Sequence, residues 1–278
     1  MNNFLVKKIL KESYSFLFDN IITIVKKIWL AMLFFISGSL IYHLLLEFKI
    51  LHSETLENVL KLSMQGKVLD IHLLVFIIST LIIAVFAFMI VTYIMGAKLK
   101  NDFSEPGILG VDWNDKVSNV AFASVILGMI FIVAMLTLWP IVRIEAAGYG
   151  VPYIAVLLLT VLSFIGLFGG AYLYARLILF IPDCLMHSTV SKESMLKSWK
   201  LTHGKVIDII SIIVGMTLPI FIISGILKMF ILLIFNAIGL DALALLICSL
   251  IVAVTQLLVV MALSVSMATI YQHMGDAK

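Results

Sequence analysis

Four side chains in the second half of the chain could together bind a metal ion: Asp183, Cys184, His187 and His203. Zinc is held by Cys, His and carboxylate ligands, often with two of them at a short spacing such as that from Cys184 to His187. Only one cysteine is present there, and His203 follows a separate polar segment. A lone cysteine is more commonly a small hydrophobic side chain. We therefore predict no metal site and no cofactor.

Hydrolase and nucleotide-binding motifs do not occur in the sequence. It has no His-Glu-x-x-His helix, no Gly-x-Ser-x-Gly turn and no glycine-rich phosphate loop. We predict that the protein is not an enzyme. A membrane-embedded hydrolase, whose nucleophile and base meet only in the folded chain, is the most distant alternative.

Gln256 and Thr255 are polar residues within a long apolar run. They could form a polar station on a transport path, or an interhelical hydrogen bond of about 0.6 kcal/mol. Ion-coupled transporters commonly carry an ionisable group near mid-membrane, and no apolar run here has one clearly at its centre. A small-solute or lipid transporter, using Gly166–Ala171, Pro219 and Gln256, is therefore an alternative hypothesis.

The composition indicates which elements carry these residues. Of 278 residues, 63% are apolar and 13% are charged, whereas soluble domains have about 25% charged residues. Continuous apolar runs of about 18 residues or more are typical of transmembrane helices, because lipid offers no hydrogen-bond partner to the backbone. We predict an all-α, polytopic protein with one integral-membrane domain over residues 1–278.

Six apolar runs predict six transmembrane helices, at 28–48, 71–96, 117–138, 153–173, 206–227 and 243–269. Residues 1–27 precede them as an amphipathic segment in the membrane interface, with Ile9 and Phe16 on the lipid face. In the fourth span, Gly166, Gly169, Gly170 and Ala171 form a small-residue face that another helix can approach. Pro219 and Gly215 are places where the fifth span can bend.

Lysine and arginine gather on one side of this layout. Most of the 19 Lys and Arg residues lie in the N-terminal segment, in the loops after the second and fourth spans, or at the C-terminus. Such an excess marks cytoplasmic loops, so we predict that both termini are cytoplasmic. The net charge of +3 does not indicate nucleic-acid binding. Cys184 and Cys248 give no disulfide framework.

Residues 174–205, between the fourth and fifth spans, form a long polar interruption. Arg176 is expected to reach the cytoplasmic surface or to pair with Asp183, since an arginine at mid-bilayer costs about 2.5–3.5 kcal/mol. A short basic helix should begin at Ser191 and end at Gly204. We expect Met195, Leu196 and Trp199 on its apolar stripe, and Lys192, Lys197 and Lys200 facing phosphates.

This segment has an Arg near the end of the fourth span, an apolar run to a Pro, and a helix ending in Ser-Trp-x-Leu-Thr-x-Gly. The residues are Arg176, Phe180-Ile-Pro182, Ser198, Trp199, Leu201, Thr202 and Gly204. The pattern resembles the YciC-type bacterial inner-membrane proteins and the membrane domain attached to some glycerophosphodiester phosphodiesterases. That family commonly has a Glu soon after the Pro, where this chain has Cys184-Leu-Met-His187. The resemblance implies a bacterial inner (cytoplasmic) membrane and little defined biochemistry.

Two interpretations of the basic helix remain open. It could bind anionic lipid headgroups or a membrane-protein partner, in a non-enzymatic role in envelope or lipid homeostasis. It could also simply join two spans at the interface, because lysine at cytoplasmic edges is the ordinary topology signal. The candidate binding residues are Arg176, Lys192, Lys197, Ser198, Trp199, Lys200, Gly204 and Lys205.

Overall fold

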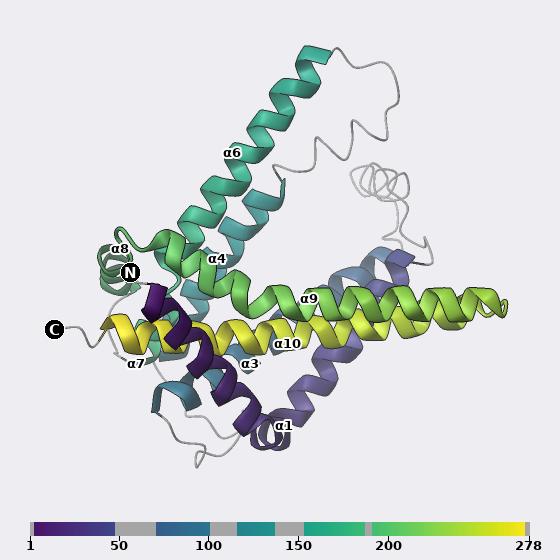
Figure 1. Cartoon of the computed structure of the whole chain (residues 1–278), viewed down its shortest axis with the longest axis horizontal. Coiled ribbons are helices and arrows are strands. Elements are labelled where there is room, and N and C mark those ends of the chain that lie inside the picture. The colour runs from purple at the N-terminus through teal and green to yellow at the C-terminus, as the bar shows by residue number, and fades with distance from the viewer. Residues whose placement is uncertain (1–2, 48–70, 101–115, 137–152, 187–190, 276–278) are drawn as a thin grey trace.

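The computed structural model describes residues 3–47, 71–100, 116–136, 153–186 and 191–275 (Figure 1). They form α1 (Asn3–Glu47), α3 (Ile71–Lys100), α4 (Lys116–Leu136), α6 (Tyr153–Leu177), α7 (Phe180–Met186), α8 (Ser191–Leu201), α9 (Val206–Ala237) and α10 (Asp241–Gly275). These ranges contain helices and turns and no strand, which confirms the predicted all-α class.

Five of these helices are long and apolar enough to cross a membrane. They are the apolar stretches Leu5–Leu44, Ile77–Lys100, Thr160–Met186, Val206–Phe235 and Asp241–Met274. In α4, which covers the predicted third span, the described apolar stretch Asn119–Ile130 is shorter. The length and composition of five helices therefore support a multi-pass membrane protein, while the sixth span stays a prediction.

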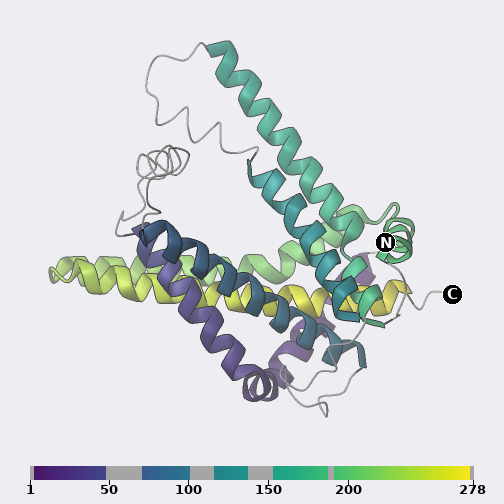
Figure 2. The ribbon, with the colours of Figure 1, turned by 180° about the vertical axis from the view of Figure 1, so that it is seen from behind.

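Helix α10 packs against several of the other described helices. It pairs with α9 as an antiparallel hairpin and also contacts α1 and α3 (Figures 1 and 2). Nearly every side chain from Met261 to Tyr271 is buried, and many are small, such as Ala262, Ser264 and Ala268. Small side chains let helix backbones approach closely, which explains how several helices can pack around this one.

The α4 and α6 helices form a second hairpin that projects away from α9 and α10 (Figures 1 and 2). At its base, α4 contacts α7, and α6 contacts α8. The small-residue face predicted at Gly166–Ala171 does not receive a helix at Gly169, where an added Cβ would meet nothing within 4 Å. That part of the prediction is wrong.

Close helix approaches occur instead at two other glycines. A Cβ at Gly38 of α1 would lie 3.0 Å from a side-chain carbon of Ile82 in α3, and one at Gly215 of α9 would lie 3.0 Å from Leu10 in α1. Gly215 is thus a packing position between α9 and α1. Helix α9 continues without interruption past Pro219 to Ala237, and Gly239, with a φ of 74°, forms the turn into α10.

The N-terminal segment and the first predicted span form one continuous helix, α1. It has 45 residues, and Figure 1 shows it bent into two arms that point in different directions. The face predicted to meet lipid is instead inside the protein, because Ile9, Phe16 and Leu17 are buried in the core of the bundle.

Candidate functional site

The candidate site is built on the chain that leaves α6. Every residue from Ala175 to Cys184 is buried, which includes the turn after Leu177 and most of α7. Arg176 and Asp183 are the charged members of this stretch, and each is 2% exposed. Residues 175–184 therefore lie inside the protein, against α8 and the end of α10.

The inner face of α8 consists of small hydroxyl residues. Ser194, Ser198 and Thr202 occur at every fourth position and are fully or almost fully buried. The hydroxyls of Ser198 and Thr202 donate to the backbone carbonyl of Arg176, at 2.9 and 3.0 Å. A carbonyl in the last turn of a helix has no partner within that helix. These two residues therefore cap the C-terminal end of α6.

The side chain of Arg176 lies under the aromatic rings at the same place. Its guanidinium carbon is 4.2 Å from the centre of the Trp199 ring and 6.0 Å from that of Tyr172. The two rings pack edge to face, with centres 6.4 Å apart. Arg176 thus neither reaches the surface nor appears in any ion pair with Asp183 in the described part of the chain, so both predicted placements differ from the structure. Its charge is balanced in part by cation–π contact.

Asp183 is instead bound by Lys197 and Tyr271. Lys197 Nζ forms an ion pair with Asp183 Oδ1, and the Tyr271 hydroxyl donates to the same oxygen at 2.7 Å. Lys197 is 40% exposed and Asp183 is almost wholly buried. The prediction that Lys197 faces phosphates is therefore wrong, because its ammonium group is directed to an internal carboxylate.

The outer face of α8 carries the remaining predicted residues. Lys192, Lys200, Leu196 and Trp199 are all exposed, the last two by 48% and 38%. Met195, predicted to lie on the same stripe, packs against the core instead. Gly204 has a φ of 71° in the turn that ends the helix, as predicted, and Lys205 is half-buried before α9. Exposed lysines and large apolar side chains thus lie together on one face.

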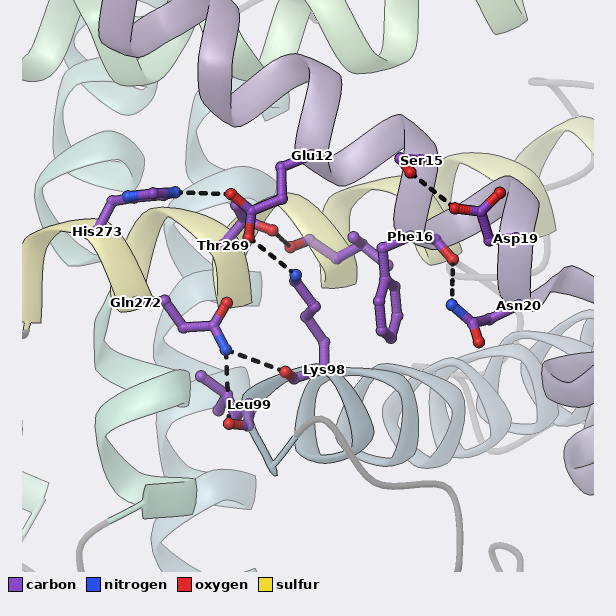
Figure 3. A network of polar contacts seen from close by, with 11 residues as sticks. Glu12, Ser15, Phe16, Asp19, Asn20, Lys98, Leu99, Thr269, Gln272 and His273 are labelled. Carbon is purple, nitrogen blue, oxygen red and sulfur yellow. Dashed lines mark hydrogen bonds and ion pairs between the residues drawn. The ribbon is translucent and has the colours of Figure 1, made fainter.

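A second polar network, which we did not predict from the sequence, joins α1, α3 and α10 (Figure 3). Glu12 binds Lys98 at 3.2 Å and His273 at 2.8 Å. The side-chain amide of Gln272 donates to the backbone carbonyl of Lys98 at 3.0 Å. Lys98 also lies 4.8 Å from the centre of the Phe16 ring. Opposite charges at one end of separate apolar runs were the only sequence signal of this contact.

The mid-span residues Thr255 and Gln256 bind neighbouring helices. Ser39 of α1 donates to the Gln256 side-chain carbonyl, and the Gln256 amide nitrogen lies 2.9 Å from Nε2 of His43. Thr255 bonds to Ser224 of α9 at 2.7 Å. Of the two interpretations of Gln256, these contacts correspond to the interhelical hydrogen bond.

The candidate metal ligands are not brought together by the described part of the chain. No group of three or more His, Cys, Asp or Glu residues there could hold an ion. His203 is exposed, Asp183 is bound by Lys197, and His187 lies outside the described residues. Cys184 and Cys248 are buried in different helices and form no disulfide with each other.

Comparison with known proteins gave no relative. Neither a scan against protein-family models, nor a search of curated proteins, nor a search of solved structures found a match.

Proposed function

We propose that this chain is a non-enzymatic, multi-pass protein of a bacterial inner membrane that binds anionic phospholipid headgroups through the outer face of α8. In this proposal α8 and both termini lie in the cytoplasm, and the protein supports lipid or envelope homeostasis. The distribution of lysine supports the orientation. The resemblance of residues 174–205 to YciC-type proteins supports the bacterial inner membrane.

One observation carries the proposal, namely that α8 has a fixed inner face and a basic, apolar outer face. The inner face is attached through Ser198 and Thr202 to α6 and through Lys197 to α7. On the outer face, Lys192 and Lys200 are exposed beside Leu196 and Trp199, and Glu193 in the first turn is the acidic residue exposed there. Helices that lie in the membrane interface combine lysine with Trp or Leu in this way.

A phosphate-bearing lipid fits this face through both of its parts. Its headgroup is complementary to the two lysines, and each lysine near an anionic surface contributes about 1 kcal/mol. The upper acyl chains can cover Leu196 and the Trp199 ring, and tryptophan is enriched at the headgroup level of membranes. Arg176 contributes indirectly in this proposal, because its guanidinium holds the Trp199 ring in place.

The test measures anionic lipid retained by the full chain, purified in mild detergent, with mass spectrometry of the extracted lipids. Reversing both charges with Lys192→Glu and Lys200→Glu removes about 2 kcal/mol of attraction or more, which corresponds to roughly a 30-fold loss of affinity. The ratio of phosphatidylglycerol to phosphatidylethanolamine should therefore fall sharply. Lys192→Arg with Lys200→Arg preserves both charges and should leave the ratio unchanged.

A matched control reverses two exposed charges elsewhere, with Lys7→Glu and Lys8→Glu on α1. An equal loss in this control would mean that the overall charge, and not α8, attracts the lipid. If the α8 variant kept its lipid ratio but lost a co-purified protein, the outer face of α8 would bind a protein partner and not lipid. Either result contradicts the proposal.

A further inference from the structure

Helix α1 carries an exposed apolar stripe on the side opposite its packed face. Phe18, Ile22, Val25 and Trp29 are exposed by 66%, 68%, 38% and 58%. Their spacings of four, three and four residues place them on one face of a helix. The buried side chains Phe16, Leu17, Ile24 and Ile28 point into the bundle instead. The helix therefore has one apolar face for the protein and a second one that no described residue covers.

The length of α1 excludes a simple crossing. As a straight helix its 45 residues would measure about 67 Å, more than twice the hydrocarbon thickness of about 30 Å. The helix bends between its two arms (Figure 1).

The charges around the stripe determine its environment. Lys7 and Lys11 precede it on the same face, and Lys26 lies beside it; all three are exposed. Of the acidic residues nearby, Glu12 is paired with Lys98 and His273, whereas Asp19 is exposed and accepts a hydrogen bond from Ser15. Lys26, beside the stripe, opposes deep insertion, because a charge at mid-bilayer costs about 2.5–3.5 kcal/mol.

We propose that the stretch Phe18–Trp29 lies parallel to the membrane at the level of the headgroups, with the stripe in the upper acyl region and Lys26 at anionic phosphates. Lipid therefore covers the exposed stripe of α1. Apolar side chains beside lysines on an in-plane helix fit this position, and Trp29 suits the same level. The inference rests on the proposed membrane location, and it does not depend on α8 binding lipid.

The depth of single labels tests this arrangement in the full chain. Phe18, Ile22, Trp29 and Ile41 are replaced one at a time by cysteine, in a Cys184→Ala, Cys248→Ala background. Each protein is reconstituted in vesicles of phosphatidylethanolamine and phosphatidylglycerol, and an environment-sensitive fluorophore is quenched by nitroxides at several acyl-chain depths. We expect labels at 18, 22 and 29 at one shallow depth, and the label at 41, in the other arm, deeper.

Three other results would overturn the inference. A depth difference near 16 Å between positions 18 and 29 would mean that the stretch runs along the membrane normal and not in its plane, since 11 residues rise by about that distance. No quenching at any depth would place the stripe in water. If the labels were protected from quenching and two Ile22→Cys chains formed a cross-link, a second copy of the chain, and not lipid, would cover the stripe. Lys192→Glu with Lys200→Glu should leave the depths unchanged, which separates this inference from lipid binding at α8.

Discussion

Tyr271 and Asp183 are 88 residues apart in the chain, yet the Tyr271 hydroxyl donates to the Asp183 carboxylate at 2.7 Å. Lys197 binds the same oxygen, so α7, α8 and α10 meet at one buried carboxylate. This contact holds α8 against the bundle in the orientation that exposes Lys192, Lys200 and Trp199. The contacts of the inner face of α8 thus determine which of its side chains are exposed.

The two partners of this ion pair should respond differently to removal. Lys197→Met leaves Asp183 buried without its cation, and breaking a buried pair in this way costs about 3–5 kcal/mol. Asp183→Asn leaves Lys197, which is 40% exposed and can turn to water, so its cost should be about 1 kcal/mol. Thermal unfolding in detergent should therefore give a much larger decrease in Tm for Lys197→Met. Equal decreases would show that the carboxylate is solvated in the native protein.

Removal of the α8 hydroxyls should uncap α6. Ser198→Ala with Thr202→Ala leaves the buried Arg176 carbonyl without its two donors, at a cost of about 1–3 kcal/mol. Thr202→Ser keeps the hydroxyl and should restore part of the loss in a Tm measurement. Ser211→Ala is the matched control, because Ser211 is exposed and bonds only to its own helix. A control that is as destabilised as the double variant would argue against capping.

Glu12→Gln should loosen the contact between α1, α3 and α10. Lys98, whose side chain is 8% exposed, would lose the carboxylate that balances its charge. Because Glu12 itself is partly exposed, we expect a loss of about 1–3 kcal/mol, measured as a lower Tm. Asp19→Asn makes the same chemical change on the exposed side of α1 and should alter stability by less than about 0.5 kcal/mol.

The membrane class and the approximate positions of the long helices followed from the apolar runs, because hydropathy and length decide where a helix can cross lipid. The structure of α1 did not follow, since Ile9 and Phe16 look the same in sequence whether lipid or protein covers them. They are buried in the core that α1 forms with α3, α9 and α10, helices distant in the sequence. A periodic pattern reports an apolar face and does not identify what the face meets.

The short helix α8 was predicted from the sequence, its lipid- or partner-binding role stays a prediction, and the contacts that orient it were not predicted. Trp199 and Gly204 were singled out from the pattern, and the exposed lysines were placed on α8. The pairing of Asp183 with Lys197 rather than Arg176 could not be read from spacing, because it depends on the turn after α6 and on Tyr271. The repeat of Ser194, Ser198 and Thr202 at four-residue intervals was a usable signal for a small, polar packing face.

The proposed orientation predicts which end of the molecule faces the cytoplasm. Lys200 is in α8, which lies at one end of the α9–α10 hairpin, and Asp241 begins α10 at the other end, after the turn from α9 (Figure 1). A maleimide that cannot cross the inner membrane should label Asp241→Cys in intact cells and Lys200→Cys only after disruption. The reverse pattern would invert the topology and place α8 away from the cytoplasmic leaflet.

Gln256→Leu separates a structural role from a transport role. In the structure the Gln256 side chain joins α10 to Ser39 and His43 of α1, and such intramembrane hydrogen bonds contribute about 0.6 kcal/mol, with values up to about 1.7. Leucine is similar in volume to glutamine and is apolar, as lipid-facing side chains are. We therefore expect a small decrease in Tm and unchanged retention of anionic lipid. Ser224→Ala, which removes the neighbouring bond to Thr255, should cost a similar amount. If Gln256→Leu left Tm unchanged but abolished a cellular phenotype that Ser224→Ala preserved, the polar group would be needed for passage of a solute, and the transporter hypothesis would take precedence.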